Sequence, residues 1–394
     1  MRGNSRPAGQ PLDQLWRRHH EELRDPHQIA AQWQWWGDVD PQLLAYTVRG
    51  DWWDVVARLH VTLLVSREYE HLLMGFSTFG GKPRISYFRL PHPSGMAVDS
   101  ARGVAYMAST RNPNAVFEFG PCAAAEGRDG HAAVLAPRQA RYLPGRLYLH
   151  DLAMIGGRLH ANAAGLNAVV QLPEGGGHKI AWWPKSIESP AGPRFDKNYL
   201  QVNSIAAGPR VESSFFSASA AAPSARRPGH LNFPVDGRGV VFSGKTGEVV
   251  GTGLTRPHSA RLVNREIWVD NSGYGQLGRI VSGRFESVHQ FSGWTRGLCV
   301  QGDVAFVGTS RVIPRYRRYA PGLNVEQSEC GLHAFDMRTG CVLGSLLWPA
   351  GNQIFAIEAV PESFSCGFPY RLGAGRMETR RIQDLYSRGL LWAA

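Results

Sequence analysis

The sequence predicts an all-β protein: a six-bladed β-propeller that is closed by an N-terminal strand and preceded by a short helical extension. Three observations support this fold class. One histidine-led segment occurs twice, strand–turn–strand units recur along most of the chain, and one hairpin sequence is repeated. Internal repeats with several short strands in each unit are typical of propellers.

The histidine-led segment supplies the most precise repeat. HDLAMIGGRLHANAAGLNAVVQL (residues 150–172) aligns without a gap with HSARLVNREIWVDNSGYGQLGRI (residues 258–280), and Gly165 falls on Gly273. Each copy has a short apolar strand, a turn and a second strand that ends in small polar residues. The two copies therefore predict equivalent positions in two different blades.

Looser copies of the same unit extend along the chain. They lie at residues 95–119, 203–219, 296–310 and 355–360, which together with the two histidine copies gives six inner strands. The last copy breaks off early, and VTLLVSREYEHLLMGFS (residues 61–77) is expected to complete its blade. This pairing would close the ring and leave no open sheet edge at the junction.

A second repeated piece marks the outer part of a blade. FSGKTGEVVG (residues 242–251) matches FDMRTGCVLG (residues 335–344), and both are predicted to be tight hairpins between outer strands. The overlapping sequence GVVFSGKT (residues 239–246) has the spacing of a phosphate-binding P-loop. A P-loop lies between a strand and a helix, whereas here strand-like residues fill the loop and GEVVGTG follows it. We therefore expect no nucleotide site there.

Three segments are expected along the chain: a helical N-terminal extension over residues 1–60, the propeller over residues 61–365 and a C-terminal tail over residues 366–394. In the extension, LDQLWRRHHEELR and DWWDVVARLH have helical spacing, with Asp51 as the N-cap of the second helix. Tryptophans crowd the extension, and a flap buried against the propeller explains them better than an aromatic ligand platform. They are Trp33, Trp35, Trp36, Trp52 and Trp53.

Composition restricts the class of protein. Hydrophobic residues make up 43% of the chain and charged residues 19%, which fits a folded globular protein. The net charge of +11 comes almost entirely from arginines spread along the chain, so we expect no nucleic acid partner. Basic and aromatic residues alternate densely only in RVIPRYRRYAPG (residues 311–322), which is expected to be an exposed loop rather than a nucleic acid platform.

Signals for membranes and secretion are missing from the sequence. No apolar run approaches the roughly 18 residues that a membrane-spanning helix needs. The N-terminus lacks the apolar stretch of a signal peptide, and the five cysteines show no CxxC spacing. We therefore expect a cytoplasmic protein with no membrane partner.

An ordered series of motifs runs from about residue 60 to residue 361: LLVSREYEHLLMGFS, PHPSGMAV, LHDLA, RPHSARL, VDNSGYGQLG, WTRGL, FVGTSR, CGLHAFDMRTG and QIFAIEAVP. This series resembles a bacterial family of conserved hypothetical proteins that are described as β-propellers of unknown function. The resemblance implies the propeller fold and no particular reaction. Where relatives are expected to carry His-Leu-Asn, this chain has Gln201-Val202-Asn203, so a three-histidine site would be incomplete. The blade arrangement is also similar to gluconolactonase and streptogramin-lyase propellers, which hold a divalent metal or a catalytic histidine at the channel mouth.

The start of each inner strand is predicted to face one mouth of the central channel. His150 and His258 occupy this position in two blades. The equivalent positions in the other blades fall near Ser94, Asn203, Thr295 or Arg296, and Phe355. We therefore expect the two imidazoles to converge at one mouth.

Two imidazoles with polar neighbours predict a site for a divalent metal ion. Its expected ligands are His150, His258, Gln201, Asn203, His92 and Glu358. Neutral imidazole suits zinc, copper or iron, whereas a set richer in oxygen suits calcium. Asp151 is expected to orient the His150 ring, and Arg296 to hold an anionic group of the substrate.

The predicted function is a metal-assisted enzyme, a hydrolase, lyase or oxygenase, that acts on a small molecule or peptide. His150, His258 and Arg296 are its expected catalytic residues. An open coordination position on the metal would activate water or polarise a carbonyl. The alternative is a non-catalytic binding scaffold. In the simplest interpretation the two histidines only cap strands through hydrogen bonds to neighbouring loops.

Overall fold

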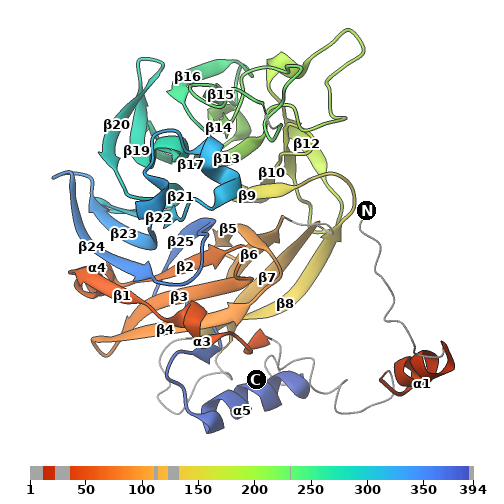
Figure 1. Cartoon of the computed structure of the whole chain (residues 1–394), viewed down its shortest axis with the longest axis vertical. Helices are drawn as coiled ribbons and strands as arrows, with labels where there is room; N and C mark the ends of the chain where they lie inside the picture. Colours follow the sequence, from red (N-terminus) through yellow and green to blue (C-terminus); the bar gives the residue numbers. More distant parts are fainter. Residues whose placement is uncertain (1–11, 23–35, 111–113, 123–132, 231, 390–394) are drawn as a thin grey trace.

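The computed structural model describes residues 12–22, 36–110, 114–122, 133–230 and 232–389. Within these residues the protein is an all-β propeller, as predicted from the sequence. Its sheets are arranged around a common centre, and β5, β9, β17, β21 and β25 lie together there (Figure 1). None of the helices in the described part of the chain is long and apolar enough to cross a membrane.

The described strands form five sheets, whose members pair antiparallel apart from one parallel contact. The first sheet has the order β25-β2-β3-β4-β26 and the second β5-β6-β7-β8. Their bounds are β2 (Val61–Arg67), β3 (Leu72–Phe79), β4 (Lys82–Arg89), β25 (Ala356–Pro361), β26 (Tyr370–Arg371), β5 (Pro93–Asp99), β6 (Val104–Ser109), β7 (Asn114–Cys122) and β8 (Val134–Leu143).

The third sheet has the order β12-β11-β10-β9, and the fourth contains eight strands. In the eight-stranded sheet the antiparallel sets β13–β16 and β17–β20 meet in a single parallel pair, Thr252 with Arg284. The bounds are β9 (Leu149–Ile155), β10 (Arg158–Ala163), β11 (Ala168–Gln171), β12 (Lys179–Trp182), β13 (Val202–Ala206), β14 (Phe215–Ala218), β15 (Gly239–Ser243), β16 (Val249–Leu254), β17 (Pro257–Val263), β18 (Glu266–Asn271), β19 (Gln276–Val281) and β20 (Arg284–Gln290).

The fifth sheet has the order β1-β24-β23-β22-β21. Its bounds are β1 (Thr47–Gly50), β21 (Trp294–Gln301), β22 (Val304–Ser310), β23 (Cys330–Asp336) and β24 (Cys341–Trp348). The helices are α1 (Leu12–Glu22), α3 (Pro41–Leu44), α4 (Trp52–Leu59) and α5 (Arg376–Ser387), with short 3-10 turns η2 (Lys185–Ile187), η3 (Val211–Ser213), η4 (Ser272–Tyr274), η5 (Pro314–Tyr319) and η6 (Val325–Gln327).

Six inner strands contact one another in a closed ring, in the order β5, β9, β13, β17, β21 and β25 and back to β5. The ring closes because β25 pairs with β2, with Leu63 opposite Ala359, which confirms the predicted completion of the last unit by an N-terminal strand. Inner strands approach closely at the axis: a Cβ on Gly95 of β5 would lie 2.4 Å from the Asp151 Cα of β9. Only glycine allows this approach.

Burial follows the distance from the axis. β2 (VTLLVSR) is buried along its whole length because sheets cover both of its faces, and this explains the apolar residues 63–65 at its centre. The outer strand β20 (RFESVHQ) is mostly exposed and correspondingly polar. Both predicted hairpins are present, with Phe242 opposite Val249 and Phe335 opposite Val342. Residues 239–246 therefore form a strand and a turn, without the helix of a P-loop.

The N-terminal extension packs on the propeller through α4. Trp52 is fully buried, with its ring edge-on to Phe306 at 5.8 Å between centroids. Asp51 is the N-cap, as predicted, although its side chain makes no capping hydrogen bond. The strand β1, which the sequence did not predict, pairs with the outer strand β24. Trp33 and Trp35 lie outside the described residues.

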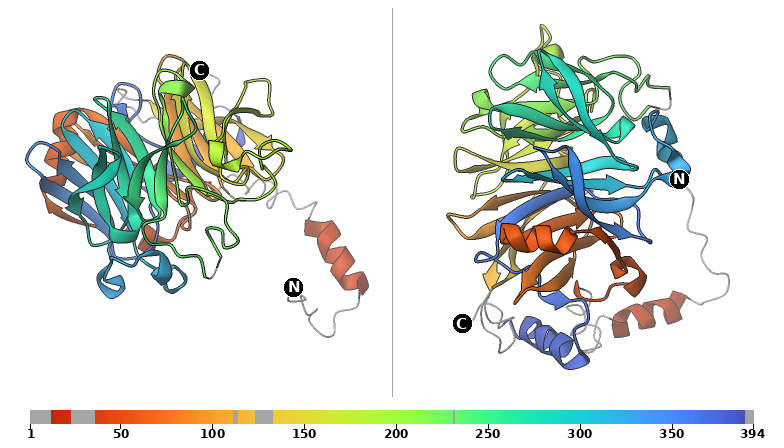
Figure 2. Two further views of the ribbon diagram at one scale, coloured as in Figure 1. Left: turned by 90° about the horizontal axis from the view of Figure 1, so that it is seen from above. Right: turned by 90° about the vertical axis from the view of Figure 1, so that its left-hand side faces the viewer.

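The C-terminal segment, predicted as a tail, contains a short strand and a helix within its described residues. β26 pairs with the outer strand β4, with Tyr370 opposite Tyr87. After it, α5 lies along the outer side of the same sheet (Figure 2) and buries Ile382 against the apolar cluster around Phe88. β1 and β26 thus cover the outer edges of two sheets, which limits the exposure of these edges to other strands.

Candidate functional site

Four of the predicted site residues line one cavity on the propeller axis. His150, Asn203 and His258 are the second residues of β9, β13 and β17, and Arg296 is the third residue of β21. Phe355, just before β25, completes this part of the lining. The cavity has a volume of about 10 Å³, which is the space of about one water molecule. The repeat therefore places the two histidines together, as the alignment predicted.

The imidazole of His258 is held in one tautomer. Its Nδ1 lies 2.9 Å from the Arg256 carbonyl oxygen and 2.9 Å from the Ser272 hydroxyl, whose own hydrogen is donated to the Thr295 carbonyl at 2.6 Å. Since both neighbours of Nδ1 act as acceptors, Nδ1 carries the hydrogen. Burial, with Arg296 and Arg256 adding repulsion, lowers the pKa of His258 well below its usual range. The neutral ring therefore has Nε2 as a proton acceptor.

Arg296 is buried among aromatic and polar groups. Its guanidinium carbon lies 3.3 Å from the centroid of the Phe355 ring, which in turn packs edge-on to His150 at 5.6 Å. With the Gln353 amide oriented to satisfy both neighbours, its oxygen accepts from Arg296 Nη1 at 2.6 Å and its nitrogen donates to Glu68 at 3.3 Å. Within the described residues the other terminal nitrogen, Nη2, is buried without a hydrogen-bond partner.

A second layer of residues lies two positions before the residues at the starts of the inner strands. His92, Tyr148, Gln201 and Arg256 precede Ser94, His150, Asn203 and His258 in four blades, and all four have positive φ, of 42°, 52°, 52° and 55°. Residues other than glycine adopt this conformation at a cost in free energy, and such positions often cluster at functional sites. The repeat thus presents a recurring bend above the axial cavity.

Two members of this layer, Arg256 and Tyr148, were missed in the sequence analysis. Arg256 Nη1 donates to Gln201 Oε1 at 2.7 Å, and its guanidinium lies over the Tyr319 ring at 4.4 Å. The Tyr148 ring packs against His150, with centroids 4.6 Å apart. The signal was available, because the alignment that superposes the two histidines also superposes Arg256 on Tyr148.

The basic and aromatic loop after β22 covers this cluster. It was expected to be an exposed loop, and Arg317 and Arg318 are exposed, but its aromatic rings turn inward. Tyr319 is buried under Arg256, and Tyr316 packs on Trp294 with centroids 5.3 Å apart. The loop therefore covers the axial mouth with its aromatic rings, and this explains why aromatic residues alternate with basic ones in its sequence.

Glu358 lies away from the histidines, whereas Asp151 lines their cavity but is paired with Arg261. Arg261 binds both carboxylates, with Nη1 3.1 Å from Asp151 and Nη2 3.3 Å from Glu358. Adjacent residues of a strand point to opposite faces, so Asp151 does not orient the His150 ring. Glu358 follows Phe355 by three residues, about 10 Å down the channel. It lines a separate pocket of about 380 Å³, and Arg261 lies between this pocket and the axial cavity.

The residues around the two histidines do not fit a divalent metal ion. The described part of the chain contains no group of three or more His, Cys, Asp or Glu side chains that could hold one. The Gln201 oxygen already accepts from Arg256, and the His92 ring packs on His71 at 4.2 Å. Two guanidiniums next to the imidazoles would also repel a cation. Metal binding thus stays a prediction that measurement must test.

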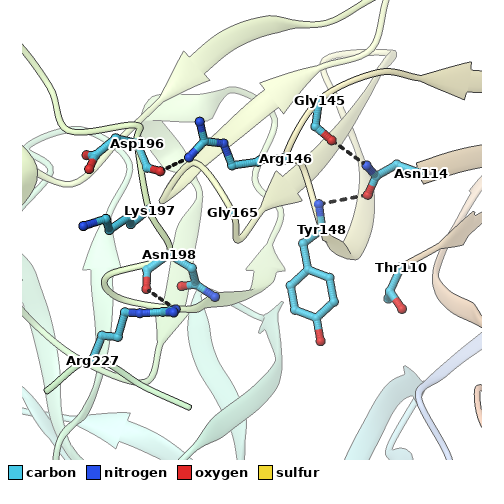
Figure 3. Close-up of a pocket in the computed structure, with 10 residues that line it drawn as sticks. All are labelled: Thr110, Asn114, Gly145, Arg146, Tyr148, Gly165, Asp196, Lys197, Asn198 and Arg227. Atoms are coloured by element: carbon cyan, nitrogen blue, oxygen red, sulfur yellow. Dashed lines mark hydrogen bonds between the residues drawn. The ribbon is translucent and has the colours of Figure 1, made fainter. Parts of the chain in front are cut away.

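A larger pocket opens on the same face of the propeller, beside the axial cluster. It has a volume of about 460 Å³ and is drawn in Figure 3. Its lining residues come from loops between the strands and from the first residue of β7: Thr110, Asn114, Gly145, Arg146, Tyr148, Gly165, Asp196, Lys197, Asn198 and Arg227. Tyr148 belongs both to this pocket and to the layer above the axial cavity, so it separates the two.

The model of a protein family described as a domain of unknown function, DUF4915, matches residues 50–367. The chain belongs to this family. The sequence analysis expected a family of unknown function, and this expectation is confirmed. The matched residues span the β-propeller described above. Among curated proteins, none matches the chain.

Solved structures similar to this DUF4915 protein have low sequence identity to it. A chain of the nidogen/laminin complex is 9% identical, with a TM-score of 0.51 over 76% of this chain and 98% of that chain. The WD40 β-propeller domain of Doa1 is 11% identical, with a TM-score of 0.39 over 63% and 86% of the two chains. A catalytically inactive virginiamycin B lyase from Staphylococcus aureus is 13% identical, with a TM-score of 0.36 over 62% and 73%. The likeness concerns the fold alone.

Proposed function

We propose that this protein is a six-bladed propeller, with the eight-stranded sheet counted as two blades, that binds a small anionic molecule at its axial mouth. His258 then accepts a proton from the bound molecule. The observation that carries the proposal is the pair of buried arginines. Arg256 and Arg296 are only 6% and 5% exposed, and in the described structure Arg256 has an amide and an aromatic ring as partners rather than a carboxylate.

Buried charges are costly unless an opposite charge compensates them. Glu68 is the carboxylate that acts on Arg296, and it does so through Gln353. Among the described residues Arg256 has no carboxylate as a hydrogen-bond partner, and an anionic ligand would supply its counter-charge. The unpartnered Nη2 of Arg296 provides a free donor for a carboxylate or phosphate oxygen.

Anion binding would also prepare His258 for proton transfer. Both arginines lower the pKa of this imidazole. A negative group bound between them offsets their charge and raises the pKa of His258 toward neutrality, where a general base is most effective. The reaction supported is abstraction of a proton from a carbon next to a carboxylate or phosphate ester, as in elimination or isomerisation.

Proton abstraction can be tested without knowing the substrate. Small carboxylates and phosphate esters are incubated with the protein in D₂O, and solvent deuterium in each compound is followed by NMR. The wild type is expected to exchange at least one compound, and His258→Asn, which keeps a donor near the Nδ1 position, is expected to bind it without exchange. Arg296→Gln should lose binding, whereas Arg279→Gln, at an exposed ion pair with Glu266, should not. Binding without exchange in the wild type would favour the non-catalytic scaffold, and no binding at all would refute the proposal.

A further inference from the structure

The 460 Å³ pocket beside the axial cluster carries three cationic side chains and one carboxylate. Arg146, Lys197 and Arg227 come from three separate loops, before β9, before β13 and between β14 and β15. Figure 3 shows these three residues on one side of the pocket, with Tyr148 and Thr110 on the other.

The cations of the pocket are not neutralised by ion pairs within the described structure. Arg146 donates to the backbone carbonyl of Asp196, and Arg227 donates to that of Asn198 at 3.5 Å. The Asp196 carboxylate accepts from the Tyr199 hydroxyl at 3.0 Å instead. The positive charge of the pocket is therefore available to a ligand.

Two residues that line the pocket, Tyr148 and Thr110, connect it to the groups around the axial cavity. Tyr148 packs on the His150 ring, and it lies near enough to Arg256 and Arg296 to influence the pKa of both. Thr110 donates to Glu68 at 3.1 Å, the carboxylate linked to Arg296. Because the axial cavity has room for about one water, this pocket is where the body of a ligand fits.

We propose that the pocket binds the phosphate group of a phosphate monoester, while a second anionic group of the same molecule reaches the axial arginines past Tyr148. This inference rests on the proposed function and specifies its substrate class. A phosphate dianion suits three cations better than a single carboxylate does, and guanidinium groups bind phosphate oxygens in pairs. The volume lies in the usual range for small-molecule sites, about 300 to 1,000 Å³.

A bifunctional probe tests the inference by calorimetry on the full chain. The probes are 6-phosphonohexanoate and 3-phosphonopropionate, with hexanoate and inorganic phosphate as the two half-ligands. At least one bifunctional probe is expected to bind about tenfold or more tightly than either half-ligand. The double variant Lys197→Gln/Arg227→Gln should weaken that probe and inorganic phosphate by about tenfold or more and leave hexanoate unchanged.

Two comparisons separate the possible failures. Arg226→Gln, an exposed arginine next to Arg227 that does not line the pocket, is the matched control and should bind all probes like the wild type. If the double variant binds every probe like the wild type, the phosphate pocket is refuted even when Arg296→Gln loses hexanoate. If the double variant loses phosphate while Arg296→Gln changes nothing, the pocket stands and the axial anion site fails.

Discussion

Glu358 supplies a pH dependence that can be calculated from the structure. Burial raises the pKa of this carboxyl to about 7, from 4.5, with Arg261 opposing the shift and Asp151 adding to it. The folded protein therefore holds the proton more tightly than the unfolded chain does. The resulting stabilisation is fully present below pH 4.5 and is lost as the pH rises through 7.

The size of the effect follows from the same shift. One pKa unit corresponds to about 1.4 kcal/mol, so the shift from 4.5 to about 7 amounts to about 3 kcal/mol. The side chain is 23% exposed, and solvent screening makes this figure an upper bound. Glu358→Gln imitates the protonated carboxyl, so it removes the pH dependence. Its amide oxygen can still accept a hydrogen bond from Arg261.

Urea unfolding of the wild type and Glu358→Gln between pH 4.5 and pH 8 tests this reasoning. The wild-type free energy of unfolding minus that of the variant is expected to fall by up to about 3 kcal/mol across this range. Glu266→Gln, at the exposed ion pair with Arg279, shows how much of the change arises from removing one surface charge. If the difference between wild type and variant changes by less than about 1 kcal/mol between pH 4.5 and pH 8, burial does not control the titration of Glu358.

Four further results are expected. Arg296→Gln should raise the pKa of His258 in an NMR titration, because Arg296 is one cause of its depression, and an unchanged pKa would contradict the described electrostatics. His150→Ala and His258→Ala, made singly, should keep the circular dichroism of a β protein while losing ligand binding or activity. Elemental analysis of the purified protein tests the predicted divalent metal: a stoichiometric ion lost in both histidine variants would support it and overturn the poor fit inferred from the structure. Trp52→Ala should destabilise the protein by about 3 to 5 kcal/mol in thermal or urea unfolding, since the ring is fully buried against Phe306.

The sequence alone determined the repeated unit and the equivalence of positions in its copies. Strand and turn patterns are local, so the alignment of residues 150–172 with residues 258–280 was enough to predict equivalent inner strands. Equivalent positions in equivalent blades lie at the same depth along the axis, and for this reason His150 and His258 line one cavity. The closing pair of β25 with β2 followed in the same way, because an incomplete last unit needed an N-terminal strand.

Only the tertiary structure decided which side chains share a site and with what charge. Glu358 lies in the correct repeat but too far along its strand, where Arg261 holds it away from the imidazoles. Arg146, Lys197 and Arg227 of the 460 Å³ pocket come from loops whose lengths differ between blades, so no sequence period relates them. Their proximity depends on how the blades pack around the axis. That packing brings the guanidinium groups of Arg256 and Arg296 close to the two imidazoles, a juxtaposition that the sequence pattern did not predict.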